Sequence, residues 1–257
     1  MRPFLTHQLP SIVPDRSRGL FTFSPGFMNI DLLLLRLVNS VAHRSSSFDA
    51  WVSFLADLPL LKGAVLTSVL WLVWFQPDRD KELHRALVIS TLLATIASLA
   101  LAKVIRSVLP FRVRPIHDAT SGFILPYYVS NETLWNWSSF PSDTAAMAFA
   151  LAGGMLMMRR QWGYTAALYS LIVICIPRIY LGYHYPSDVA AGALLGGLSA
   201  FVMSCYPIRS RLSRPVLSWS QHYPSTFYCA FFVLTYEVAT VFENTRQILA
   251  AAGKLFR

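Results

Sequence analysis

The chain has few charged residues for its length. Asp, Glu, Lys and Arg make up only 14% of its 257 residues, whereas 54% of the residues are hydrophobic. A soluble domain usually contains about 25% charged residues. This shortage of charge excludes an ordinary soluble domain and is typical of a chain that folds within a membrane.

Other absences exclude further classes of protein. The 22 Lys and Arg residues give a net charge of +9, but they form no run of five or six. Basic residues spread over short loops are a membrane pattern, so we expect no binding to nucleic acid. The three cysteines are an odd number and lie in or beside apolar runs, which predicts no disulfide framework. Residues 1–25 contain four prolines and no apolar run, so we expect no secretory signal peptide.

What the chain does contain is apolar segments close to membrane-spanning length. About 20 apolar residues cross a bilayer as a helix. Six segments approach that length: 58–75, 86–109, 141–158, 164–180, 186–206 and 226–242. The last of them contains Glu237 and can instead lie along the membrane surface. We expect an all-α fold, a polytopic membrane helical bundle of about six transmembrane helices.

These segments divide the chain into three parts. Residues 1–57 are an N-terminal extension, in which residues 29–42 are apolar but too short to span and predict an interfacial helix. Residues 58–206 are the transmembrane core, and residues 207–257 hold a cytoplasmic loop, a last transmembrane helix and a tail. Glycine-rich helices pack within one chain as readily as between chains, so the sequence predicts no oligomeric state.

Lys and Arg in the short loops predict the orientation of the bundle. They concentrate at 79–85, 159–160 and 209–214, and loops of this kind are usually cytoplasmic. The loop at 110–140 and the turn at 182–185 then lie on the outer face. The basic termini argue against this orientation. We expect an integral protein of a bacterial inner membrane with these two loops on the periplasmic side.

Polar residues gather at three junctions between the apolar segments. Ionisable side chains at such places are costly and are usually retained for function. The second segment ends, the third begins, the fourth ends and the fifth begins on one face of the membrane, so these junctions are expected to meet. The junctions are Arg106–Pro115, Ser138–Thr144 and Arg178–Asp188.

The residue types at the junctions suit a bound phosphate. Arg106, Arg114 and Arg178 supply planar, permanently charged donors. Ser142 and Asp143 stand where the third segment begins, and free N–H groups at a helix start form an anion site with the Ser142 hydroxyl. Three arginines would repel a divalent cation, so we expect no metal and no cofactor. The expected ligand of these residues is a phosphate group.

His184 is the candidate nucleophile. A neutral imidazole can attack phosphorus and form a covalent intermediate. Asp188 follows four residues later, close enough to hydrogen-bond one ring nitrogen and fix the tautomer. The other ring nitrogen is then left to attack.

Together these segments resemble the signature of the type 2 phosphatidic acid phosphatase superfamily, the lipid phosphate phosphatases. That signature has three parts, Lys-x6-Arg-Pro, Pro-Ser-Gly-His and Ser-Arg-x5-His-x3-Asp. The matching residues are Arg114-Pro115, Pro141-Ser142, Arg178, His184 and Asp188. The resemblance implies a six-helix membrane core and metal-independent dephosphorylation through a phosphohistidine on His184, which Asp188 supports.

Three departures from this signature matter for the chemistry. Ser107 occupies the position of the lysine; Arg106 is the nearest substitute, Lys103 the second, and Arg112 is a further cationic candidate. A proline precedes Arg178 where the family has serine.

Thr144 is the third departure, because it replaces the histidine that in the family protonates the leaving group. General acid catalysis is typically worth about 10² to 10⁴-fold, and a threonine hydroxyl does not supply it near neutral pH. Three interpretations follow. The enzyme favours lipid diphosphates such as a polyprenyl diphosphate, whose leaving group is less basic; or His117 is the acid; or the chain has low activity.

The sequence therefore predicts a membrane lipid phosphatase acting on a polyprenyl diphosphate or a phosphatidate-type lipid. Two alternatives stay open. A phosphotransferase would pass the phosphate to an acceptor hydroxyl in place of water. A non-catalytic lipid-phosphate binder would explain Thr144, but it would not need His184 and Asp188 at working spacing.

Overall fold

The computed structural model describes residues 25–77, 79–243 and 245. All regular structure in these residues is helical, which confirms the expected all-α fold. Two of the elements, η1 and η3, are π-helical turns and η2 is a 3-10 turn. The elements are α1 (Pro25–Asn39), α2 (Ser46–Asp57), η1 (Leu60–Ala64), α3 (Val65–Phe75), α4 (Lys81–Val108), η2 (Pro115–His117), α5 (Asp143–Met158), α6 (Arg160–Tyr169), η3 (Ser170–Cys175), α7 (Ile176–Tyr180), α8 (Pro186–Ser204), α9 (Tyr206–His222) and α10 (Pro224–Ala239).

The six predicted apolar segments all correspond to helices. They match η1 with α3, then α4, α5, the continuous helix from α6 to α7, α8 and α10. Two helices were not expected. α2 begins after Ser45, whose hydroxyl accepts the N–H of Phe48 at 3.4 Å. α9 replaces the loop expected after residue 207, because arginine is a good helix former and a proline stands in its first turn.

Fewer helices have full spanning length than the sequence leads us to expect. Among the described residues, three helices are long and apolar enough to cross a membrane: α4, residues 160–180 and α8. The pair formed by α2 and residues 60–75 also qualifies but is bent by 56°, which gives up to four spans. α5 and α10 have only 16 residues each. The membrane-type helical bundle therefore combines three or four long helices with several shorter ones.

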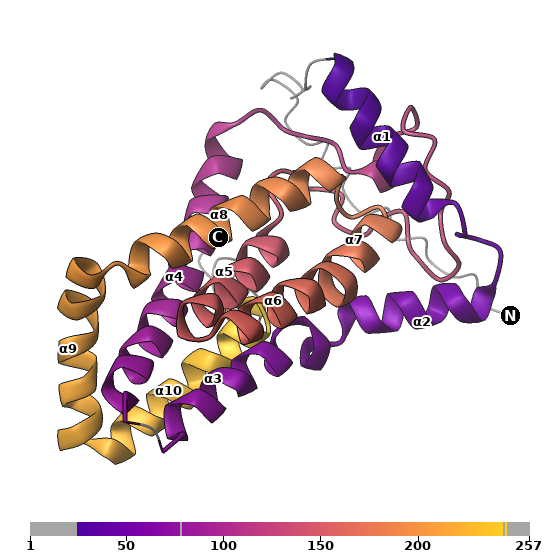
Figure 1. Ribbon diagram of the computed structural model, residues 1–257. Coiled ribbons are helices and arrows are strands. Elements are labelled where there is room, and N and C mark those ends of the chain that lie inside the picture. The colour runs from indigo at the N-terminus through magenta and orange to yellow at the C-terminus, as the bar shows by residue number, and fades with distance from the viewer. Residues whose placement is uncertain (1–24, 78, 244, 246–257) are drawn as a thin grey trace, which may run out of the picture.

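α5 lies at the centre of the bundle, between α4 and α8 (Figure 1). Glycines permit the close packing, because a Cβ atom on Gly154 would lie 2.0 Å from the Thr91 hydroxyl of α4. On the other side, a Cβ atom on Gly192 would lie 2.3 Å from the Ser142 carbonyl. α8 therefore presses against the start of α5, where the N–H of Ser142 donates to the Asp188 carbonyl at 3.1 Å. This contact joins two of the three polar junctions.

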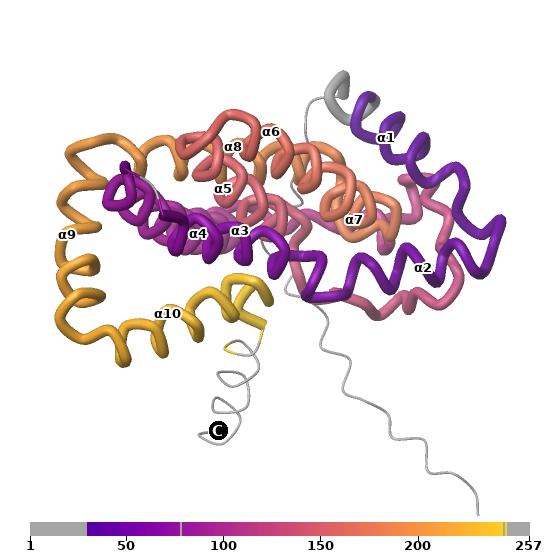
Figure 2. The backbone as a smooth tube through the Cα atoms, turned by 60° about the horizontal axis from the view of Figure 1, so that its bottom comes forward, coloured from indigo at the N-terminus to yellow at the C-terminus, as the bar shows by residue number. Residues whose placement is uncertain are grey.

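α10 returns to the bundle after α9 has led away from it (Figure 2). The Trp74 indole of α3 donates to the Tyr228 hydroxyl of α10 at 3.1 Å. Farther along, a Cβ atom on Gly63 would lie 2.6 Å from the Ala239 carbonyl, so only a glycine lets η1 and α10 touch here. The end of α10 is thereby held beside η1, close to the polar junctions.

α1 packs against α7 and α8. Leu35, Asp31 and Asn39 are buried on its inner side, whereas Leu33 and Leu37 are exposed. An outward apolar face on a short helix is the pattern of an interfacial helix. The inward face brings a carboxylate, Asp31, to the bundle.

Candidate active site

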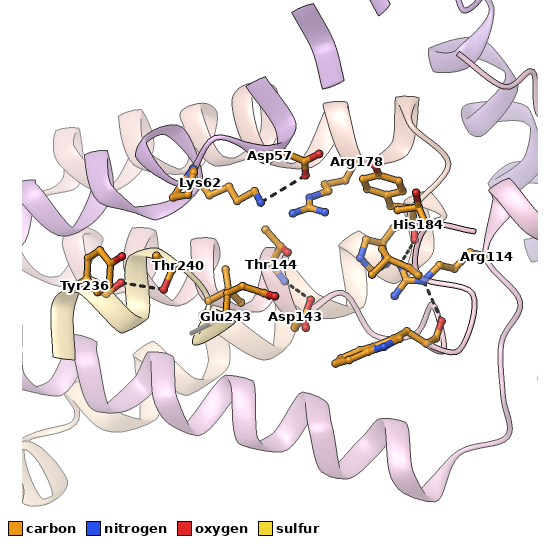
Figure 3. A pocket seen from close by; sticks show the side chains of 16 residues that line it. Asp57, Lys62, Arg114, Asp143, Thr144, Arg178, His184, Tyr236, Thr240 and Glu243 are labelled. Atoms are coloured by element: carbon orange, nitrogen blue, oxygen red, sulfur yellow. Dashed lines mark hydrogen bonds and ion pairs between the residues drawn. The ribbon is translucent and has the colours of Figure 1, made fainter. Parts of the chain in front are cut away.

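A pocket of about 640 Å³ lies where the polar junctions come together (Figure 3). Its lining includes residues from the loop after α4, the start of α5, the end of α7 and the turn before α8. Those residues are Arg114, Asp143, Thr144, Arg178 and His184. The structure thus assembles the residues that crossing order alone predicts to meet.

His184 is buried in the turn between α7 and α8. Its Nδ1 lies 2.9 Å from the Ser139 carbonyl, and a carbonyl can only accept, so Nδ1 carries the proton. The lone pair is then on Nε2. The nearest carboxylate oxygen of Asp188 is 3.8 Å from Nδ1. The direct hydrogen bond expected from Asp188 is therefore made by a backbone carbonyl, and the carboxylate acts from a longer distance.

The surroundings of His184 favour its neutral form. Burial lowers the pKa of the imidazole below its usual value; the Asp188 carboxylate raises the pKa, and the Arg114 charge lowers it further. A protonated imidazole has no lone pair for attack on phosphorus. The site therefore keeps the ring in the nucleophilic state near neutral pH.

Asp188 is completely buried and is held by three donors. Its carboxylate accepts hydrogen bonds from Arg112 Nη1, from the Ser139 hydroxyl and, at 2.7 Å, from the backbone N–H of Tyr185. Ser139 also supplies the carbonyl that binds His184, so the same residue contacts both members of the pair. The ring and the carboxylate are fixed by one network.

Arg112 does not line the pocket, although the sequence makes it a candidate phosphate ligand. Its guanidinium lies between two buried carboxylates, that of Asp188 and that of Asp31 on α1, the latter at 2.6 Å. Asp31 also accepts from the N–H of Ser187 at 2.8 Å. Asp31 was missed by sequence reasoning, although an acidic residue inside the apolar run 29–42 was a signal that could have revealed it.

Arg114 lines the pocket and is anchored by backbone carbonyls. Its Nε donates to Trp137 at 3.0 Å, its Nη2 to Ser138 at 3.2 Å and its Nη1 to Tyr183. Burial lowers the pKa of Arg114 to about 10, so the guanidinium stays charged at neutral pH. A cation that three carbonyls hold in place can face an anion without having to be reoriented.

Arg178 also lines the pocket and stacks against the Tyr183 ring, with 5.4 Å between the guanidinium carbon and the ring centre. Its Nε is buried and has no hydrogen-bond partner among the described residues. Buried donors are nearly always paired in folded proteins. An unpaired arginine donor beside a pocket favours an anionic ligand there.

Ser142 caps α5, accepting the N–H of Ala145 at 3.4 Å, but it is buried and does not line the pocket. Asp143 does, and one of its oxygens accepts the Thr144 N–H at 2.9 Å. The other oxygen lies 3.6 Å from Arg106 Nη2. The start of α5 therefore already holds a carboxylate, and Arg106 compensates its charge.

Comparison with known proteins identifies the family of the chain. A model of the family described as the PAP2 superfamily matches residues 63–211, more than half of the chain. The chain belongs to the PAP2 superfamily.

Three individual relatives have low sequence identity to this chain, between 24% and 28%. Undecaprenyl-diphosphatase BcrC of Bacillus subtilis (strain 168) is 24% identical over 169 residues, covering 66% of this chain and 80% of that protein. The putative undecaprenyl-diphosphatase YbjG of Escherichia coli (strain K12) is 28% identical over 177 residues, covering 69% and 80%. The solved structure of Aquifex aeolicus LpxE is 28% identical, with a TM-score of 0.47, and covers 69% of this chain and 96% of that one. As a PAP2 member, the chain is a phosphatase that acts on lipids.

In this PAP2 chain, two further sequence candidates lie outside the pocket lining, as do Arg106, Arg112, Ser142 and Asp188. Lys103 lies exposed on α4. His117, considered as a substitute acid, has its Nε2 at 2.8 Å from the Asn131 carbonyl and its ring against Trp135, with 4.6 Å between ring centres. Neither residue lines the pocket. Thr144 does line the pocket, at the start of α5.

The pocket also contains residues that sequence reasoning missed. Lys62 of η1 and Asp57 at the end of α2 form one wall, and Tyr236, Thr240 and Glu243 reach it from the end of α10. Lys62 interrupts an apolar segment, which was a usable signal. The α10 residues carry no comparable signal, because only the tertiary path of that helix brings them here.

Proposed function

We propose that this PAP2 protein hydrolyses the terminal phosphate of a lipid diphosphate, with a polyprenyl diphosphate as the favoured substrate, through a phosphohistidine on His184. Phosphatidate-type lipids are the alternative substrates. The observation that carries the proposal is a buried imidazole, with Nδ1 hydrogen-bonded to a backbone carbonyl, in the same pocket as Arg114 and Arg178. The ring offers a lone pair, and the arginines offer charged donors that hold a phosphate.

In this proposal the terminal phosphate lies between Arg114 and Arg178. Nε2 of His184 attacks phosphorus, the bond from phosphorus to the bridging oxygen breaks, and its electron pair leaves with the lipid monophosphate. Water then attacks the phosphohistidine, releases inorganic phosphate and returns the lone pair to Nε2. The proposed role of Asp188 and Ser139 is to orient the ring during both steps.

The preference for a diphosphate rests on Thr144. Cleavage of a lipid monophosphate expels an alkoxide, which needs a proton in the transition state. Cleavage of a diphosphate expels a phosphate, whose last proton dissociates with a pKa of about 6, so no acid is required near neutral pH. Two relatives of this chain bear the name undecaprenyl-diphosphatase, which supports the same substrate class.

We further propose that the pocket opens on the periplasmic face of a bacterial inner membrane. Arg106 stands at the pocket end of α4, whereas Lys81 and Arg85 stand at its other end. Arg159 and Arg160 lie between α5 and α6, also at the end away from the pocket. Basic residues of short loops favour the cytoplasmic side, which supports an outward-facing site.

A phosphate-release assay tests the proposed function. Purified protein is given phosphatidate, polyprenyl phosphate and polyprenyl diphosphate in detergent micelles, with His184→Ala as the control. We expect fastest release from the diphosphate and a loss of at least about 10³-fold in the variant. An acid-labile phosphoenzyme should be trapped in the wild type alone. Undiminished turnover by His184→Ala would exclude the mechanism, and product analysis with an added lipid alcohol would reveal transfer in place of hydrolysis.

A further inference from the structure

Lys62 is a mostly buried cation in a place where lysine is costly. It lies in η1, within the bent helix pair that is apolar enough to cross a membrane. Its ammonium is 3.6 Å from the carboxylate of Asp57; the Lys62 side chain is 18% exposed, whereas that of Asp57 is 58% exposed. Ionisable residues in apolar spans are usually retained for function. A mostly exposed partner does not account for a mostly buried lysine, because ion pairs near water contribute little.

The local backbone aims Lys62 into the pocket. η1 is a π-helical turn, a feature that occurs frequently at functional sites. The next residue, Gly63, is in contact with the Ala239 carbonyl of α10, and this contact fixes how η1 is turned. Lys62 and Arg178 extend their charged ends toward the same part of the pocket, on the side of Thr144 away from Asp143 (Figure 3).

Three cations line the pocket, together with the carboxylates of Asp57, Asp143 and Glu243. Arg114 and Arg178 come from the same side as His184, and Lys62 comes from a different helix. Of the acidic residues in the lining, Asp143 is already paired with Arg106. The volume of about 640 Å³ leaves room for a second phosphate beside the one that faces His184.

We propose that Lys62 binds the inner phosphate of a lipid diphosphate and stabilises the charge that develops on it. This inference rests on the proposed function. When Nε2 of His184 attacks the terminal phosphorus, the electron pair of the broken bond passes to the bridging oxygen, which stays on the lipid monophosphate. The Lys62 ammonium neutralises that charge without giving up a proton. Charge stabilisation thus replaces the proton donor that Thr144 does not provide.

The proposal makes Lys62 a specificity residue. A lipid monophosphate has no inner phosphate, and its alkoxide leaving group needs a proton more than a neighbouring charge. Removing the ammonium should therefore harm diphosphate hydrolysis selectively.

The test compares Lys62→Met and Lys62→Arg on polyprenyl diphosphate and polyprenyl phosphate of the same chain length. Methionine keeps the apolar length without the charge, and arginine keeps the charge. We expect Lys62→Met to lower kcat/KM for the diphosphate about 100-fold and for the monophosphate less than about threefold. Lys62→Arg should retain at least about a third of the diphosphate activity. Lys81→Met is the matched control, because Lys81 is exposed at the far end of α4, and it should change neither.

Inhibitor binding gives a second readout that does not require turnover. Methylenediphosphonate carries two phosphorus groups and inorganic phosphate carries one. Lys62→Met should raise the inhibition constant of the diphosphonate at least about tenfold and leave that of phosphate unchanged.

Equal losses of kcat/KM on both substrates, or equal losses in the Met and Arg variants, would overturn the role of Lys62. A wild-type protein that releases phosphate from no lipid would refute the proposed function itself, whereas a Lys62→Met variant that cleaves the diphosphate normally would refute only this inference.

Discussion

The two halves of the pocket are built differently. On the nucleophile side, His184 and Asp188 are buried, and a continuous network of Ser139, Arg112 and Asp31 holds them. On the leaving-group side, the two walls come from η1 with α2 and from the end of α10, and Lys62 has one mostly exposed partner.

This difference corresponds to two requirements. The nucleophile side must support attack on phosphorus for every substrate, whereas the leaving-group side must suit the particular lipid. Attack on phosphorus requires one tautomer and one ring orientation, and His184 and Asp188 are accordingly buried and held by several hydrogen bonds. The leaving group differs between lipid monophosphates and diphosphates, so the residues that meet it can change without disturbing the nucleophile. In the proposed mechanism, His184 keeps its supporting network while Thr144, on the leaving-group side, supplies no proton.

Among the tests of this comparison between the two halves, the largest expected effect comes from breaking the network at Asp31, its end most remote from the pocket. Asp31→Asn removes the charge of one of the two carboxylates that contact Arg112. The Arg112 guanidinium is then attracted more strongly to the remaining carboxylate, Asp188, and the shift of Asp188 disturbs the orientation of the His184 ring. Loss of such supporting partners typically costs about 10 to 100-fold in activity. We expect kcat to fall by about 30-fold on every substrate, with KM changed less than about twofold.

Asp80→Asn is the control for Asp31→Asn, because Asp80 is exposed at the start of α4 and undergoes the same chemical change. Gel filtration and thermal unfolding in detergent should show that both variants remain folded. A change confined to KM, or to one substrate, would contradict the separation between the two halves of the pocket.

Thr144→His should have a smaller effect, and in the opposite direction. A histidine at this position of α5 can protonate an alkoxide, so we expect hydrolysis of a lipid monophosphate to rise about tenfold. Diphosphate hydrolysis should change less than about threefold, since a leaving phosphate needs no acid. Phosphate release from both substrates measures the ratio. A greater gain on the diphosphate would show that the leaving-group side does not work as proposed.

The sequence predicted which polar residues lie near one another, but it did not predict the direction of every side chain. Three short motifs were enough to bring Arg114, Arg178 and His184 to one pocket, because crossing order fixes which helix ends share a face. The same reasoning assigned Arg112 to the phosphate, whereas its guanidinium lies between two buried carboxylates. Motif spacing shows which residues are near one another and does not show which way each side chain points.

The packing of the helices outside the motifs was harder to predict than their positions in the sequence, for a physical reason. α10 meets η1 because Gly63 leaves room for the Ala239 carbonyl, and no local pattern in the sequence shows that pairing. This contact brings Tyr236 and Glu243 to the wall opposite the arginines. The leaving-group side therefore depends on long-range packing, while the nucleophile side depends on the local turn before α8.

The smallest expected effect is a shift in the pH dependence of kcat. It tests whether water is excluded from the nucleophile side to the degree that the burial of His184 indicates. Burial lowers the pKa of His184, so the ring is neutral above that lowered value and becomes protonated only as the pH falls through it. The acid limb of kcat should accordingly lie below the ordinary histidine value of about 6.5. Because the substrate phosphate titrates nearby, NMR of ¹³C-labelled histidine in detergent is the direct measurement, with His184→Ala assigning the signal. A titration at or above about 6.5 would mean that water reaches the ring, and the contrast between a closed nucleophile side and an open leaving-group side would then fail.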